Sequence, residues 1–286
     1  MLTENKRNYK ENKVQRQLGV FFRHFVLIIW CSTTLFPLLW TLNSAFRNNT
    51  QIFGNTLGLP NPVIWGNIPD VVTRVDMLTT GGNSLIYAAV TVALVILLAT
   101  PVAFYGAKIA KKPLITLYFA LGIFIPGQAL LIPLFIDVRS FDLMNSRSGI
   151  ILVYVVTNLA FSIFVLTAFM KTAIPTEVVE ASIIDGCGLY GAFWHVVLPL
   201  ARTGIATAVT FVFLGVWNEF LFALVMLPSP ALRTLNLATL SLRGQFTSDQ
   251  GLISAGVIAL VTPAIVIYTL FQEQVVKGLT SGAVKG

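Results

Sequence analysis

Charged residues are scarce in this chain of 286 residues, where lysine, arginine, aspartate and glutamate together make up 11%. A soluble domain usually carries about 25% charged residues, so a soluble surface of this size would lack polar cover. Hydrophobic residues make up 56%, and the mean hydropathy is +0.80. The composition therefore argues against a soluble enzyme, a nucleic-acid-binding domain and a disordered chain. It indicates a polytopic membrane protein.

Residues that hold metals or nucleotides are also scarce. The chain has two cysteines, Cys31 and Cys187, in different kinds of segment, so we expect no disulfide. His24 and His195 have no cluster of further ligands, so we expect no metal site and no acid–base role for either. The phosphate-binding pattern Gly-x-x-x-x-Gly-Lys-Ser/Thr does not occur. We therefore expect no bound cofactor, no catalytic residue and no ATPase site in this chain.

Six apolar runs are long enough to cross the roughly 30 Å of hydrocarbon in a bilayer as helices. The runs are continuously apolar and do not alternate, which favours helices over strands. The expected fold class is all-α, a polytopic helical membrane protein with six transmembrane helices. The predicted spans are 20–42, 83–107, 113–136, 149–170, 203–227 and 253–272.

The positive charges predict how these spans are oriented. Thirteen lysines and arginines fall on one side of the membrane with both termini, and six fall on the other side. The positive-inside rule places both termini in the cytoplasm, and topology explains the net charge of +7 better than a nucleic-acid partner does. We expect a cytoplasmic segment 1–19 without a signal-peptide cleavage site, a transmembrane domain 20–272 and a cytoplasmic tail 273–286.

Segment 43–82 lies on the external side in this topology. It is rich in proline and glycine and is predicted to be an irregular loop of about 40 residues. A loop of this length is usually functional or bound to a partner. A plain connector remains an equal alternative.

The cytoplasmic connection 171–202 has a pattern of two short helices. Pro175 and the threonine after it suit a helix start, and Gly186 can end this helix in the left-handed conformation. A second short helix is predicted over 189–195, stopping before Pro199. The sequence thus predicts a helix–glycine–helix element on the cytoplasmic face.

The apolar side chains of this element need a surface to pack against. Residues 172–201 contain no lysine or arginine, whereas helices that lie on a membrane surface are usually rich in both. Their acidic residues, Glu177, Glu180 and Asp185, disfavour an anionic leaflet. The groove of a soluble partner protein is the better interpretation.

A known motif runs through the same element. Glu180-Ala181-Ser182, three residues, Gly186, nine residues and Val196-x-Leu198-Pro199 resemble the EAA loop of ABC importer permeases, with Ser182 in place of alanine and Val196 in place of isoleucine. Asp185 before the glycine is similar to the sugar-importer version of this loop.

Two further stretches strengthen the resemblance. Residues 217–220, Trp-Asn-Glu-Phe, resemble a motif of carbohydrate permeases, and residues 271–286 resemble the end of MalG-like second permease subunits. The family often has prolines early in the fourth span and after the loop. This sequence has Ala160-Phe161 and Thr203-Gly204 instead, which puts the helix kinks of the pathway in doubt.

The resemblance implies a transport subunit and not an enzyme. Its partners would be a homologous second permease, a cytoplasmic dimer of ABC ATPases that uses ATP and Mg, and an extracytoplasmic solute-binding protein. The chain would sit in a bacterial-type plasma membrane, contact no nucleic acid, and form half of an alternating-access pathway for a sugar or oligosaccharide. The family's coupling helix docks on the ATPase. Here that role falls on Glu180, Ala181, Ser182, Asp185, Gly186 and Leu189.

The tail and the membrane interior supply further candidates. The resemblance favours an ATPase contact at Gly278, Gly282 and Lys285, although such a glycine-rich end can equally be a frayed terminus. Within the spans, Asn218 and Glu219 can contact solute, act in gating, or hold helices together. Asn158, and Gln128 between two prolines, suit a translocation pathway as well as static kinks.

Two other classes of protein remain open at this stage. An ion-coupled secondary transporter of a small polar solute could share the six spans, but it normally needs ionisable groups inside the membrane. This chain offers little beyond Glu219. A membrane-embedded enzyme would need clustered histidine, aspartate or serine at bilayer depth, and the spans show no such cluster.

Overall fold

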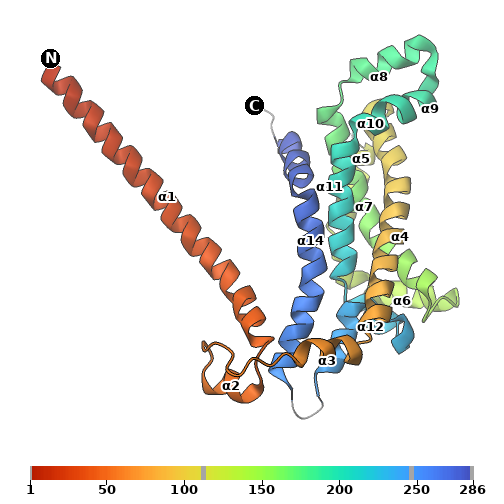
Figure 1. Ribbon diagram of the computed structural model, residues 1–286. Coiled ribbons are helices and arrows are strands. Elements are labelled where there is room, and N and C mark those ends of the chain that lie inside the picture. The colour runs from red at the N-terminus through yellow and green to blue at the C-terminus, as the bar shows by residue number, and fades with distance from the viewer. Residues whose placement is uncertain (1, 111–113, 245–247, 284–286) are drawn as a thin grey trace.

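In the computed structural model, a bundle of roughly parallel helices runs between two ends, and one long helix is inclined away from it (Figure 1). The structure describes residues 2–110, 114–244 and 248–283, and for 2–16, 115 and 274–283 it describes the backbone alone. Over these ranges the fold is all-α, with one isolated β-bridge between Arg243 and Ser248. The end of the bundle that carries residues 174–200 is called the upper end here, and the opposite end the lower end.

The helices follow one another with short breaks, and several of them are single turns of 3-10 or π-helix. In chain order they are α1 (Leu2–Ser44), α2 (Asn49–Gly54), α3 (Asn67–Arg74), α4 (Met77–Phe104), η1 (Tyr105–Ile109), α5 (Leu114–Ile123), η2 (Gly127–Leu130), α6 (Leu131–Ser140), α7 (Arg147–Ala173), α8 (Thr176–Ser182), η3 (Ile183–Cys187), α9 (Gly188–Ala192), η4 (Phe193–Val197), α10 (Leu198–Leu200), α11 (Arg202–Trp217), α12 (Leu221–Met226), η5 (Pro230–Leu232), α13 (Leu235–Ala238), η6 (Thr239–Leu242) and α14 (Gln250–Ala283).

The described helices include five that are long and apolar enough to cross a membrane, or six if a bent pair counts as one. Four predicted spans lie in α1, in α4 with η1, in α7 and in α14. The span predicted at 113–136 is broken in the structure, and it counts as a span only if the two helices on either side of the break are taken together. The chain breaks between Ile123 and Gly127, and the segments on either side are bent by 87°. The extended Pro126, which has no N–H to continue the helix, lies in this break.

The span predicted at 203–227 is also interrupted. α11 ends at Trp217, and after a break of three residues α12 begins at Leu221. The segment Thr176–Leu200 is long and apolar enough to cross a membrane, but positive φ angles at Gly186 and Gly188 turn it back on itself. It therefore forms a helical hairpin at the upper end (Figure 1).

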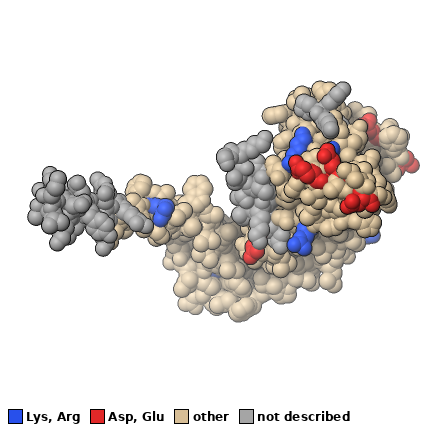
Figure 2. All heavy atoms as spheres, turned by 90° about the horizontal axis from the view of Figure 1, so that it is seen from above, with Lys and Arg blue, Asp and Glu red and all other residues tan. Residues whose placement is uncertain are grey.

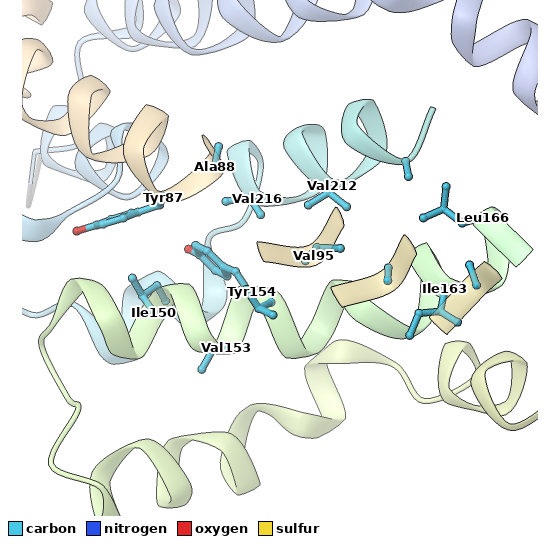
Figure 3. Close-up of a cluster of buried hydrophobic side chains, with 14 of the residues drawn as sticks. Tyr87, Ala88, Val95, Ile150, Val153, Tyr154, Ile163, Leu166, Val212 and Val216 are labelled. Carbon is cyan, nitrogen blue, oxygen red and sulfur yellow. The ribbon is translucent and has the colours of Figure 1, made fainter. Parts of the chain in front are cut away.

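The core of the bundle lies between α4, α7 and α11. Figure 3 shows side chains from these three helices converging, with Val95 from α4, Ile163 from α7 and Val212 from α11 among them. Ala99 and Ala208 are fully buried in the same cluster, and their small side chains allow the helices to approach closely.

The lower end is more ordered than the irregular loop predicted for 43–82, because α2, α3 and the start of α4 lie within that range. The guanidinium of Arg47, 1% exposed, donates to the carbonyls of Gln51, Asn55 and Thr56. The Asn67 side chain donates to Arg47 O at 3.0 Å. Buried polar side chains thus replace the missing regular hydrogen bonds of this connection.

α1 stands apart from the bundle. None of its apolar window within Gln17–Ser44 is buried, and it contacts α14 and the lower-end connection. Trp40 Nε1, for example, donates to Thr56 O at 2.9 Å. The start of α1 and the end of α14 both lie at the upper end with the hairpin (Figure 1). The two described ends of the chain therefore lie towards the same end of the molecule.

α14 is longer than predicted. Its helix continues to Ala283 and so extends into the segment 273–286 that was predicted as a cytoplasmic tail.

Candidate functional site

The hairpin 174–200 at the upper end folds around two glycines. Gly186 has φ 91° and ψ 4°, and Gly188 has φ 61° and ψ 176°. Both angles are costly for residues with a Cβ atom, so glycine at these positions allows the chain to reverse between α8 and α9. The predicted end of the first helix at Gly186 is confirmed. The predicted stop before Pro199 is wrong. Pro199 lies in α10, which follows η4 directly, so the helical run continues past this proline to Leu200.

One face of the hairpin is packed against the bundle. Val179 is 2% exposed, and Ala192 and Val197 are fully buried in the same hydrophobic cluster as the core of α4, α7 and α11. This packing holds the hairpin on the end of the bundle as part of the same folded unit.

The other face of the hairpin is open. Ile184 is 84% exposed, Tyr190 78% and Leu189 52%, which is unusual for large apolar side chains outside a lipid or protein contact. Figure 2, which looks down on the upper end, shows acidic side chains gathered over this part of the molecule. The open face therefore combines apolar and acidic groups.

The residues proposed for docking lie mostly on this open face. Ser182 is half-buried, and its hydroxyl donates to Val179 O at 2.7 Å. A Cβ added at Gly186 would meet nothing within 4 Å, so the space beside it is free. The exposed members of the predicted set are Glu180, Ala181, Asp185, Gly186 and Leu189.

Two contacts join both halves of the hairpin to the upper end of α4. The Lys108 ammonium, in η1, donates to Ile174 O and to the Thr176 hydroxyl, the latter at 3.4 Å. Phe104 packs its ring against Phe193 with centroids 5.6 Å apart. Lys108 is one of the thirteen lysines and arginines on the predicted cytoplasmic side, and its position in the sequence does not distinguish it from the lysines that follow.

Glu219 lies in the break between α11 and α12. Its carboxylate accepts hydrogen bonds from the backbone N–H groups of Phe222 at 2.7 Å and Ala223 at 3.1 Å, so it caps the start of α12. The Tyr154 hydroxyl on α7 donates to the same carboxylate at 2.9 Å. The break is therefore closed by one acidic side chain and is braced against α7.

The other candidates inside the spans are only partly brought together with Glu219. Asn158 lies one turn along α7 from Tyr154, whose carbonyl accepts its amide hydrogen bond at 2.8 Å. Asn218 is exposed, and its carbonyl accepts from Asn236 at 2.9 Å. Gln128 is exposed in η2, at the bend between α5 and α6. Tyr154 and Asn236 were missed, because only the fold brings them to the break.

Residues 95–281 match the family described as "Binding-protein-dependent transport system inner membrane component". The match spans more than half of the chain and includes both the hairpin and the break at Glu219. The chain belongs to this family. The permease is therefore a transport component and not an enzyme.

Curated relatives extend over nearly the whole permease. It is 30% identical over 263 residues to the diacetylchitobiose uptake system permease protein NgcG of Streptomyces coelicolor, covering 91% of this chain and 87% of the relative. It is 32% identical over 264 residues to the sulfoquinovosyl glycerol transport system permease protein SmoH of Agrobacterium fabrum, covering 88% and 89%.

A solved structure has a similar fold. It is the crystal structure of a bacterial ABC transporter involved in the import of the acidic polysaccharide alginate. The TM-score is 0.77 at 20% identity, over 90% of this chain and 96% of that chain. At this identity the likeness concerns the fold alone.

The tail residues of the permease are only partly described. Gly278 and Gly282 lie on α14, which reaches the upper end, whereas Lys285 lies outside the described residues.

Proposed function

We propose that the permease is one subunit of an ATP-driven importer and forms half of a translocation pathway for a sugar or oligosaccharide. The family description supports dependence on a binding protein, and the names of two relatives support a carbohydrate as solute. Its partners would be a homologous second permease, a pair of ABC ATPases that use ATP and Mg, and an extracytoplasmic solute-binding protein. It would sit in a bacterial-type plasma membrane with its upper end, and thus both termini, in the cytoplasm.

The observation that carries this proposal is the open face of the hairpin. The exposed apolar side chains of Ile184, Leu189 and Tyr190 gain free energy when a protein groove removes them from water. Glu180 and Asp185, also exposed, offer carboxylates to basic groups of a partner and disfavour an anionic lipid surface. We assign this face to the ATPase.

The glycines of the hairpin suit such docking. The reversal at Gly186 leaves no side chain between the backbone and an incoming surface, and the Cβ position is open. A docked ATPase can therefore approach the backbone there. The rest of the hairpin is anchored to the bundle by Val179 and Val197, so movement of the docked surface is passed to the spans.

In this mechanism ATP binding closes the ATPase pair and moves the two hairpins of the permease pair. The pathway then opens alternately to the solute-binding protein and to the cytoplasm. ATP can shift the equilibrium between the outward-open and inward-open states only because these two states make different contacts with the ATPase. At the end of α14, we assign Gly278, Gly282 and Lys285 to a second contact with the ATPase.

The ion-coupled alternative has no support of its own in the structure. Glu219 is the acidic residue that it would need, and three donors already engage its carboxylate, two of them backbone N–H groups of α12. We therefore assign Glu219 to holding the break between α11 and α12.

The test uses Ile184, whose side chain is 84% exposed, so that a substitution removes little packing within the chain. Ile184→Arg should sharply reduce the amount of ATPase that co-purifies with the tagged permease from its native membrane. Leu57→Arg is the matched control, because Leu57 is 70% exposed at the lower end. Equal recovery of ATPase with the parent and with Ile184→Arg, together with unchanged uptake, would rule out docking at this face.

A further inference from the structure

The helical run formed by α4 and η1 is hydrogen-bonded by side chains both to the hairpin 174–200 and to the connection that follows α12. The run has 33 residues, Met77–Ile109, and is about 50 Å long at 1.5 Å per residue. It therefore extends from one end of the bundle to the other (Figure 1).

At its upper end α4 holds the hairpin where the hairpin leaves α7. Lys108 is 9% exposed, and its ammonium donates to Ile174 O and to the Thr176 hydroxyl, on both sides of the junction between α7 and α8. A buried ammonium needs such partners, because removing a charge from water is costly. The ring contact of Phe104 with Phe193 also attaches α4 to the part of the hairpin that follows the glycine turn.

At its lower end α4 holds residues 231–235 through buried polar side chains. Asn83, 2% exposed, donates to Ala231 O at 2.9 Å and to Arg233 O at 3.1 Å. The Tyr87 hydroxyl donates to Leu232 O at 2.9 Å, and the Ser84 hydroxyl accepts from Leu235 N at 2.8 Å. These bonds hold an irregular connection to the surface of α4 over about one turn of the helix.

Between its two ends α4 is packed tightly against α7 and α11. Ala88, Val95, Ala99 and Ala103 are fully buried in the core cluster. A close-packed helix moves as a unit more readily than it deforms. A displacement of the hairpin that reaches Lys108 is therefore delivered to the other end of α4.

We propose that α4 couples the hairpin 174–200 to the connection 228–238, with Lys108 and Asn83 as the positioning residues at its two ends. The proposal rests on the proposed function, since the ATPase supplies the movement of the hairpin. In addition, α4 is the element that carries that movement to the side of the membrane where the solute-binding protein docks.

The test follows both ends of α4 by thiol alkylation in the complete transporter purified from its membrane. Cys187 lies exposed on the hairpin and reports ATPase docking. In a second background, Cys31→Ala and Cys187→Ala remove the native thiols, and Ala231→Cys places a probe on the exposed connection next to Asn83. Alkylation rates are compared without nucleotide and after trapping with ATP and vanadate.

In the parent, we expect a protected Cys187 and a rate at position 231 that trapping changes by at least about fivefold, the lower end of common coupling factors. In Lys108→Met, the ratio of the alkylation rates at position 231 with and without trapping should be close to one, while Cys187 stays protected. Lys108→Arg should restore the ratio of the parent. Lys171→Met is the matched control, because the Lys171 ammonium, at the end of α7, donates to the Thr116 hydroxyl on α5, and its loss should leave both responses unchanged.

The outcomes separate the two proposals. An unprotected Cys187 in the parent, with the ATPase present, contradicts docking at the hairpin and with it the proposed function. Protection of Cys187 together with an unchanged ratio at position 231 in Lys108→Met, or no response at position 231 in the parent, overturns the role of α4 alone. If Lys108→Met does not assemble, Asn83→Leu decides in the same way, because it frees the connection and leaves the hairpin intact.

Discussion

Replacing Glu219 should weaken the start of α12 by an amount that follows from its three hydrogen bonds. Glu219→Ala removes the cap that accepts from Phe222 N and Ala223 N, which costs about 1 kcal/mol. It also leaves the hydroxyl of Tyr154, which is 1% exposed, without its acceptor, which costs about 1–3 kcal/mol more. We therefore expect the free energy of unfolding to fall by about 2–4 kcal/mol.

Tyr154→Phe separates the two parts of this cost. By itself it removes one hydrogen bond to a charged acceptor and should cost about 1.5–3 kcal/mol. In the Glu219→Ala background the hydroxyl is already unpaired, so the same change should be nearly neutral or favourable. The double-mutant cycle should therefore be non-additive by about 2 kcal/mol.

The measurement is denaturant unfolding of the purified permease combined with hydrogen exchange at the amides of Phe222 and Ala223. Glu219→Ala should speed exchange at both amides. Ser146→Ala is the control, because Ser146 caps α7 through Gly149 N and should leave these amides protected. Additive effects of Glu219→Ala and Tyr154→Phe, or unchanged exchange at the two amides, would refute the assignment of Glu219 as a cap and brace.

Four further substitutions test the packing of the fold in the same unfolding assay. A Cβ at Gly251 would lie 1.9 Å from Arg47 O, so Gly251→Ala should destabilise the fold by about 1–3 kcal/mol. A Cβ at Gly82 on α4 would meet nothing within 4 Å, so Gly82→Ala should stabilise the fold by about 0.5–1 kcal/mol. Equal effects of the two alanines would contradict the close contact. Arg47→Lys cannot keep the fork of donors that binds three carbonyls and should lower the free energy of unfolding by about 1–3 kcal/mol. Proteolysis of residues 48–58 should also become faster. An unchanged cleavage rate would count against Arg47 as the anchor of this segment. Trp217→Phe loses the bond to Leu260 O and should cost about 1 kcal/mol, a loss that an unchanged midpoint would exclude.

Hydropathy predicted the spans well because burial in lipid is a property of each segment alone. The hairpin turn at Gly186 was also predictable, since glycine at a helix end is a local signal. The break between Ile123 and Gly127 was not predicted from the apolar run around it. A hydropathy average does not record where the backbone hydrogen bonds are lost.

The partners of the candidate site could not be predicted for a different reason. Lys108 meets Ile174 across 66 residues, and Tyr154 meets Glu219 across 65. Such pairs depend on how the helices are arranged around one another. The sequence does show that a charge or a hydroxyl lies in an apolar run and needs a partner, but only the fold shows which partner it has.

The separation of α1 from the bundle has a consequence for the biosynthesis of this protein. α1 is synthesised before the rest of the described bundle, and none of its apolar window within Gln17–Ser44 is buried by other parts of the described chain. Its insertion into the bilayer therefore depends on its own hydrophobicity, and it does not have to wait for a later helix. The six lysines and arginines up to Arg23 can fix its direction at that moment. The direction of α1 is then set before the core of α4, α7 and α11 exists.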